Sequence, residues 1–366
     1  MGRLTRAFTI VEKLNVDWVG IAIILCLGIF GIFLILTINP SLALQQSVFL
    51  AIGLILALLV SLLHPAILWW FAPIGYIMSL VLLLSAYIGP SIRGATRWIV
   101  VLGVQLQPSE FVKPLLLLFF TWIITKYPPR SLKYIPIHIG VFLLPFLLVM
   151  KQPDLGSSMV YASFWIAMML AGGLPLGFLV ISLTGITILI PGIWHLLASY
   201  QKARILTFLN PALDPKGASY NAIQSMIAVG SGQLFGRGLG RGTQSHLRFL
   251  PEHHTDFIFA TLVEELGFVG GFFLLIGYLI LFWRIIGPLI HGKIIDIMPF
   301  VYTVGLFSML LSQMFINIGM NMGIVPITGI TLPLISYGGS SLLSIGVSFG
   351  LLWTIYKGQS IDRTIA

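Results

Sequence analysis

The 366-residue chain is 58% hydrophobic, and only 8% of its residues are charged, whereas about 25% are charged in ordinary soluble domains. This composition excludes a soluble globular protein and indicates an integral membrane protein. The net charge of +9 is scattered over many loops, which favours anionic lipid headgroups or phosphorylated substrates over nucleic acid as partners.

Apolar windows long enough to cross a bilayer recur along the chain. A membrane-spanning helix needs about 20 mostly apolar residues, and windows of that kind lie at residues 18–38, 46–63, 67–87, 110–124, 135–150, 157–171, 176–197, 257–282, 299–318 and 334–356. The alternation of barrel strands is absent, so the windows must form helices that satisfy their own backbone hydrogen bonds. The sequence therefore predicts an all-α polytopic membrane protein, a bundle of about ten transmembrane helices that forms one domain over residues 1–366.

Positive charges in the short loops predict the orientation of the bundle. Ten spans place both termini on the same side, and cytoplasmic loops are usually the richer in Lys and Arg. With the N-terminus inside, the inner segments hold Arg3, Arg6, Lys13, Lys126, Arg130, Lys133, Arg284, Lys293, Lys357 and Arg363, and the short outer loops hold Arg93, Arg97 and Lys151. We therefore expect both termini in the cytoplasm. The first apolar window lacks a convincing cleavage site and is interpreted as a retained helix.

One outer loop is much longer than the others. Residues 198–256, between the seventh and eighth spans, face the outside in this orientation and are rich in Gly, Lys, Arg and His. Loops of this length in compact bundles are usually functional or disordered. An apolar, helix-like piece at residues 223–229 favours a membrane-surface element folded back on the bundle. A flexible loop is the alternative.

Ionisable side chains inside or beside membrane spans are costly, so each one is a functional candidate. Glu110 and Lys113 are three residues apart and share one face of a predicted helix. They either form a structural ion pair or line a polar cavity that receives substrate. Asp154 lies just before the sixth span and either caps that helix or takes part in catalysis.

Asp256 closes the long outer loop in the segment HHTDFIF, at the mouth of the eighth span. A carboxylate at the water interface, next to cationic loops, can act as a general base, a metal ligand or a proton relay, or it can cap the helix. Glu264 and Glu265 lie about two turns deeper and either support Asp256 or join a network with Lys113. The two adjacent histidines only weakly indicate metal, because neighbours on a helix or strand point apart.

The motifs of soluble-nucleotide chemistry are absent from the sequence. The chain has no Walker-type glycine-rich loop, no HExxH, no GxSxG and no DxD pair of the kind that holds a metal-bound nucleotide sugar. Its single cysteine, Cys26, leaves no disulfide framework and no cysteine-rich metal site.

Several longer motifs, taken together, resemble those of one known family. They are GATRWI with QPSEFVKP, KQPDLGSS, the stretch from NPALDPKGASYN to LPEHHTDFIFATLVEELG, and NIGMNMGIVPITGITLPLISYGGSS. Their order and extent, from the first span to about residue 352, resemble the SEDS family of shape, elongation, division and sporulation proteins, typified by RodA and FtsW. Within that family, KQPD and GTQSHLRFLPE are more similar to RodA.

The resemblance implies a peptidoglycan glycosyltransferase of the bacterial cytoplasmic membrane that polymerises lipid II on the outer face, for cell-wall elongation and rod shape. It also implies a class B penicillin-binding protein as cross-linking partner, other proteins of the elongation complex, and undecaprenyl-linked glycan as a ligand. The aspartate of the family's HTDFIF motif, thought to be catalytic, falls on Asp256. The acid and lysine of its QPSExxK motif fall on Glu110 and Lys113, and the arginine of its RW motif falls on Arg97.

The implied reaction suits these residues. A sugar hydroxyl attacks an anomeric carbon whose leaving group is a lipid-linked diphosphate, and a positioned carboxylate, Asp256, can take the hydroxyl proton. The departing diphosphate needs positive charge, from Arg or Lys side chains or from a divalent cation such as Mg²⁺ or Mn²⁺. The candidates for contact with substrate are Arg97, Glu110, Lys113, Asp154, Arg204, Arg248 and Glu264. A single displacement would convert the α-linked diphosphate into a β-linked glycan.

Two other functions fit parts of the pattern. A lipid flippase would distribute polar residues across the depth of the membrane, whereas the polar motifs here gather in the outer half and the outer loops. A non-catalytic scaffold that only activates a penicillin-binding protein would tolerate a neutral residue at position 256.

Overall fold

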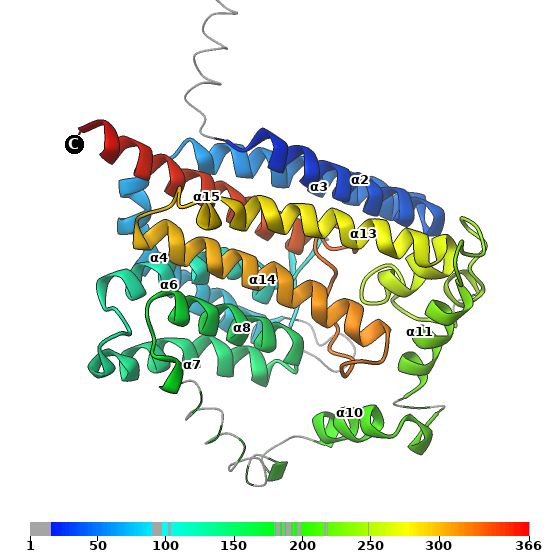
Figure 1. The fold of residues 1–366 in the computed structure, drawn as a ribbon. Helices are drawn as coiled ribbons and strands as arrows, with labels where there is room; N and C mark the ends of the chain where they lie inside the picture. The colour runs from blue at the N-terminus through cyan, green and yellow to red at the C-terminus, as the bar shows by residue number, and fades with distance from the viewer. Residues whose placement is uncertain are drawn as a thin grey trace, which may run out of the picture.

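The computed structural model describes residues 16–89, 97–101, 104–178, 199–215, 217, 219–247 and 249–365, together with residues 180, 184, 187, 192, 194 and 195. Over these ranges the chain forms a bundle of long helices that run roughly along one another (Figure 1). The long helices are α2 (Trp18–Ile38), α3 (Pro40–Ser61), α4 (Pro65–Ser85), α6 (Lys113–Lys126), α7 (Ile135–Lys151), α8 (Leu155–Ala171), α13 (Ile258–Ile290), α14 (Ile297–Asn321) and α15 (Gly339–Ile365). The prediction of an all-α polytopic membrane protein is confirmed.

The helices match most of the predicted spans, and the last span begins later than predicted. In the part of the chain that the structure describes, eight helices are long and apolar enough to cross a membrane when the short helical turns next to α4, α6 and α7 are counted with them. Helix α8, with 17 residues, is shorter. The last span was predicted to begin at residue 334, but α15 begins at Gly339, because Leu334 has a φ of 67° and the preceding residues form turns. The predicted span 176–197 lies mostly outside the described residues.

Local signals explain where several helices begin. Pro40, Pro65 and Pro108 each stand in the first turn of a helix, where the missing N–H costs no hydrogen bond. The side chain of Asn39 caps α3 by accepting from the amide of Ser41, at 2.9 Å. Such caps satisfy backbone donors that the helix itself leaves unpaired.

Small residues allow close contact between two helices of the bundle. Helix α15 packs along α3, and a Cβ atom on Gly346 would lie only 2.2 Å from the carbonyl oxygen of Gly53. Lipid tails are as apolar as leucine, so helices in membranes associate through such close backbone packing. The two glycines therefore fix α15, and the loop that precedes it, against α3.

A short hairpin lies in the predicted loop that holds Arg97. Strands β1 (Ile99–Val101) and β2 (Val104–Leu106) pair antiparallel, with Ile99 opposite Leu106. The hairpin leads into a one-turn helix, α5 (Pro108–Phe111), which continues into α6. It was not predicted because its two strands have only three residues each.

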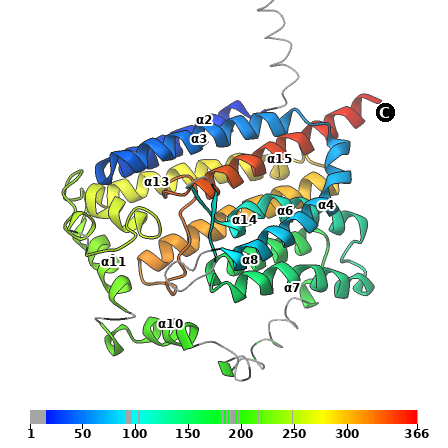
Figure 2. The same cartoon turned by 180° about the vertical axis from the view of Figure 1, so that it is seen from behind.

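The long loop before α13 contains helices of its own. They are α10 (Ser199–Leu209), α11 (Tyr220–Ser231) and the one-turn α12 (Thr243–His246), with a 3₁₀ turn, η3 (Pro211–Leu213), after α10. The predicted helix-like piece falls on α11, which packs against α13 and α14. Helix α10 lies apart from the packed helices in both views (Figures 1 and 2).

The segment after α11 fits into a break in α13. Gly267 interrupts the helix with a φ of 70° and a ψ of −167°, so the surrounding peptide groups lose their helical partners. The amides of Arg237 and Gly238 donate to the carbonyls of Glu264 and Glu265, at 2.9 and 3.0 Å. The amides of Phe268 and Val269 donate in return to carbonyls in the loop, at 2.8 and 3.1 Å. The loop is thereby held to the N-terminal part of α13, the helix that follows Asp256.

Candidate functional site

Asp256 and Arg97 meet over a glycine. Asp256 is half-buried in the turn that leads into α13, and Arg97 is half-buried just before β1. A Cβ atom on Gly329 would lie 3.3 Å from Oδ2 of Asp256 and 3.8 Å from both Nη atoms of Arg97. The carboxylate and the guanidinium therefore lie within 4 Å of one point, the Cβ position of residue 329. The two residues are 159 positions apart in the sequence, at 97 and 256.

Gly329 provides the space for this approach. Its φ of +74° lies in the left-handed region that favours glycine, and any side chain at that position would point at the two charged groups. The Nε atom of Arg97 is buried and has no hydrogen-bond partner in the described part of the chain. An anionic ligand would supply the acceptor that this donor lacks.

The backbone around Asp256 is held from outside its own loop. The Asp256 carbonyl accepts from the side-chain amides of Asn317 and Asn321 on α14, at 2.9 and 3.1 Å. The Ser336 hydroxyl donates to the carbonyl of Thr255 at 2.6 Å, and the Tyr337 amide donates to the carbonyl of His254 at 2.9 Å. Three consecutive carbonyl groups are thus fixed by α14 and by the segment before α15.

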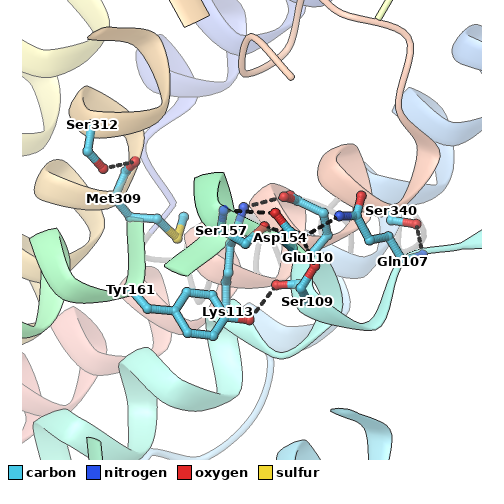
Figure 3. Close-up of polar contacts among 10 residues, drawn as sticks. All are labelled: Gln107, Ser109, Glu110, Lys113, Asp154, Ser157, Tyr161, Met309, Ser312 and Ser340. Carbon is cyan, nitrogen blue, oxygen red and sulfur yellow. Dashed lines mark hydrogen bonds and ion pairs between the residues drawn. The ribbon is translucent and has the colours of Figure 1, made fainter. Parts of the chain in front are cut away.

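Asp154 is the centre of a second polar cluster (Figure 3). Its Oδ2 atom accepts from Gln107 Nε2 at 2.9 Å, Ser109 Oγ at 3.0 Å and Ser157 Oγ at 2.8 Å, and its Oδ1 atom accepts from the Ser157 amide at 3.0 Å. The carboxylate is fully buried and caps α8, as one of its two sequence interpretations expected. It ties the start of α8 to the hairpin that follows Arg97.

Glu110 and Lys113 form the ion pair that their spacing predicts. Both side chains are buried, and Lys113 is only 1% exposed, so neither charge is neutralised by solvent. Figure 3 shows Glu110 and Lys113 beside the Asp154 cluster, and Glu110 directly follows Ser109 in α5. Ser340, at the start of α15, accepts from the amide of Gln107 at 3.0 Å and so ties the Asp154 cluster to α15.

Glu264 lies under the long loop. Its carboxylate is fully buried and accepts from the amides of Gln244 and Ser245, at 2.8 and 3.2 Å, and from the hydroxyls of Thr243 and Ser245, at 3.2 and 3.0 Å. These groups form the first turn of α12. Neither Asp256 nor Lys113, the two partners considered from sequence, is among these contacts. Glu265 accepts from the hydroxyl of Thr37 at 3.3 Å.

The remaining candidates occupy other places. Arg204 lies on α10, the helix that stands apart from the bundle in both views (Figure 2). Arg248 lies outside the described residues. His253 and His254 flank the site, and the His254 ring lies against that of Tyr337, with centroids 5.9 Å apart. Burial raises the pKa of the Tyr337 phenol, and its hydroxyl donates to the side-chain oxygen of Gln45.

Sequence reasoning missed the residues that hold Asp256. Asn317, Asn321, Gly329 and Ser336 all lie in the motif that begins NIGMN, and none of them was predicted as a site residue. The available signal was the pair of asparagines four positions apart in an otherwise apolar helix, because buried amides in a membrane span need partners.

Comparisons with known proteins identify the family of the chain. A family model described as "Cell cycle protein", which covers FtsW, RodA and SpoVE, matches residues 12–361. The peptidoglycan glycosyltransferase MrdB of Escherichia coli K12 is 38% identical over 315 residues, which is 85% of each chain. A solved structure from a study of a peptidoglycan synthase complex has a TM-score of 0.81 at 30% identity and covers 95% of this chain and 98% of its own.

RodA of Thermus thermophilus, a rod shape determining protein, is also similar in structure. Its crystal structure has a TM-score of 0.70 at 28% identity and covers 93% of this chain and 96% of its own. The family match extends over nearly the whole chain and includes both polar clusters. The chain therefore belongs to the SEDS family of FtsW, RodA and SpoVE, and within it is similar to RodA.

Proposed function

We propose that this chain is a peptidoglycan glycosyltransferase that polymerises lipid II, with Asp256 as general base. The observation that carries the proposal is the approach of Asp256 and Arg97 over Gly329, which places a carboxylate and a cation at one point beside the membrane helices. A base for the attacking hydroxyl and a positive charge for the departing diphosphate each favour glycosyl transfer from a lipid diphosphate. The family membership and the printed name of the E. coli relative support the same activity.

The reaction assigns a separate task to each charged group. Asp256 accepts the proton of the attacking sugar hydroxyl as the new C–O bond forms at the anomeric carbon. The bond from that carbon to the lipid diphosphate breaks, and Arg97 stabilises the negative charge that develops on the departing phosphate oxygen. One displacement inverts the anomeric carbon and gives a β-linked strand. Arg248 and Arg204, on the same long loop, are further candidates for the diphosphate.

A divalent cation is expected to enter with the substrate. In the part of the chain that the structure describes, no three His, Cys, Asp or Glu side chains gather where they could hold a metal ion, so the residues present do not fit a resident metal centre. Mg²⁺ is usually held by substrate phosphates together with one or two carboxylates. The diphosphate itself is therefore the proposed ligand for Mg²⁺ or Mn²⁺.

The partner and the orientation follow the same proposal. The solved structure with the highest similarity given above comes from a peptidoglycan synthase complex, which supports a class B penicillin-binding protein as partner, with other elongation proteins around it. The chain is a multi-pass membrane protein. The distribution of Lys and Arg supports cytoplasmic termini, and this orientation places Asp256 at the outer face of the cytoplasmic membrane.

The experiment that tests the function compares wild type with Asp256→Asn. The purified chain and its penicillin-binding partner are incubated with lipid II, and the length and amount of glycan are measured. We expect polymerisation to fall by about 100- to 10,000-fold, the usual contribution of a general base. Asp296→Asn is the matched control, because Asp296 precedes α14 at the opposite end of that helix from the site.

The outcomes separate the alternatives. Undiminished polymer from Asp256→Asn would contradict the proposal and favour a scaffold that only activates its partner. If neither protein made polymer but both moved labelled lipid II across liposome membranes, the chain would be a flippase. Pull-down of the partner and the melting temperature show whether the variant is folded and assembled.

A further inference from the structure

Two buried asparagines of α14 hold the turn that carries Asp256. Asn317 and Asn321 are four residues apart, so they share one face of the helix, and both side chains are fully buried. An amide inside a membrane bundle is costly unless all its hydrogen-bonding groups are satisfied. Their partners therefore show what the two residues do.

The Asn321 side chain replaces a helical hydrogen bond at the start of α13. In a regular helix the amide of Ala260 would donate to the carbonyl of Asp256, four residues earlier. Instead the Ala260 amide donates to Oδ1 of Asn321 at 3.2 Å, and Nδ2 of Asn321 donates to the Asp256 carbonyl at 3.1 Å. The amide is inserted into what would be the first turn. Helix α13 consequently begins at Ile258, and Asp256 stays in a turn.

The Asn317 side chain links two loops through one nitrogen atom. Its Nδ2 atom donates to the carbonyl of Asp256 at 2.9 Å and to that of Ile330 at 2.7 Å. An amide NH₂ group has two hydrogens, one for each of these two carbonyl oxygens. If the Asn317 amide were turned the other way, its own oxygen would face both carbonyl oxygens, and three acceptors would lie together without a donor. Ile330 follows Gly329, the residue over which Asp256 and Arg97 meet.

We infer that Asn317 and Asn321 are positioning residues, which act through the Asp256 peptide to set the carboxylate against Arg97 and Gly329. The inference rests on the proposed role of Asp256. Asn321 prevents α13 from extending back to include Asp256. Asn317 fixes the distance between the turn that holds Asp256 and the turn that holds Gly329. Neither side chain is placed in contact with substrate; each supports the group that is.

The test measures polymerisation by Asn317→Ala and Asn321→Ala in the intact complex with the penicillin-binding partner. A displacement of about 1 Å at a reacting group can cost about 100-fold in rate, so we expect kcat/KM to fall by about 10- to 100-fold. Thr303→Val is the matched control. Thr303 is also fully buried on α14, and its hydroxyl bonds to the Pro299 carbonyl and the Tyr356 hydroxyl, remote from Asp256.

The pH profile separates a positioning role from a merely structural one. Arg97 favours the charged form of Asp256, so a turn that moves away from Arg97 would raise the apparent pKa of the acid limb of kcat/KM. A smaller folded fraction would lower the rate and leave the shape of the profile unchanged. The other titratable groups around this turn, which could also contribute to the profile, are Glu252, His253, His254 and Tyr337.

Each result decides the matter. A lower kcat/KM with the acid limb shifted to higher pH in the Asn317 and Asn321 variants, but not in Thr303→Val, supports the inference. A wild-type rate, or a lower rate with an unshifted profile, overturns it. If the alanine variants are too slow for a full profile, Asn317→Ser retains one donor and is measured instead. If Asp256→Asn is inactive but the asparagine variants behave like wild type, only the positioning role of the asparagines is refuted. If Asp256→Asn is fully active, the proposed function, with Asp256 as general base, is itself refuted.

Discussion

The backbones of Gly236 and Gly267 are in such close contact that a Cβ atom on Gly267 would lie 2.3 Å from the amide nitrogen of Gly236. In the reverse direction, a Cβ atom on Gly236 would lie 2.1 Å from the carbonyl oxygen of Glu265. Both glycines have a positive φ, of 78° and 70°. This contact joins the long loop to the break in α13, and it leaves no room for a side chain on either residue.

Alanine at either glycine is expected to destabilise the contact between the long loop and α13. The left-handed backbone costs about 1–3 kcal/mol for a non-glycine residue, and the backbone must also move apart to admit the methyl group. We expect Gly236→Ala and Gly267→Ala to lower the apparent melting temperature in detergent by roughly 5 °C or more, with faster proteolysis between α10 and α12. Gly230→Ala on α11 is the control, because nothing lies within 4 Å of its Cβ position. Equal stability of all three variants would contradict the close contact.

Gly329 is expected to matter for activity more than for stability. A methyl group there would press on Oδ2 of Asp256, and the φ of +74° adds strain. Gly292→Ala carries the same kind of strain, with a φ of +62°, but nothing lies within 4 Å of its Cβ position. Gly329→Ala should therefore lose at least tenfold in lipid II polymerisation while its melting temperature falls no further than that of Gly292→Ala. Similar rates for the two variants would show that the space above Gly329 is not used.

Arg97 is expected to act through the shape of its guanidinium group. Both Nη atoms lie equally near the Gly329 position, and a planar fork can bind phosphate through two parallel hydrogen bonds, whereas a lysine offers a point charge. We expect Arg97→Ala to reduce kcat/KM for lipid II by about 100-fold or more, and Arg97→Lys to recover only part of that loss. Complete recovery with lysine would show that charge alone suffices. Lys151→Ala, a cation outside both polar clusters, is the control.

Some of this site could be predicted because it depends on local spacing. Glu110 and Lys113 pair across three positions of one helix, and Asp154 caps the helix that follows it, so both contacts can be inferred from neighbouring residues. The helices themselves follow from the length of the apolar windows. Asp256 could be singled out because a carboxylate at the mouth of a membrane span needs a reason to be there.

The rest depends on contacts between distant parts of the chain. The Asn317 side chain donates to the Asp256 carbonyl across 61 residues of sequence. Nothing in the sequence next to either residue indicates this contact. The break at Gly267 is also invisible in hydropathy, because the residues on both sides of it are apolar enough for one continuous helix. Its cause is the loop after α11, which supplies hydrogen bonds that the helix would otherwise make to itself.

The buried pair of Glu110 and Lys113 provides a test of function against structure. Removing one partner leaves an uncompensated buried charge, which costs about 3–5 kcal/mol, whereas apolar or neutral residues of similar volume can replace both at little cost. We expect Glu110→Gln and Lys113→Met to reduce the yield of folded protein when introduced singly, and the double variant to restore the wild-type melting temperature. If the double variant is stable, the pair is not required for folding, and a polar pair kept inside a membrane bundle then indicates a functional task. The double variant should therefore fold normally and polymerise lipid II at least tenfold more slowly. A wild-type rate from the folded double variant would make the pair structural and would confine the substrate contacts to Asp256, Arg97 and the long loop.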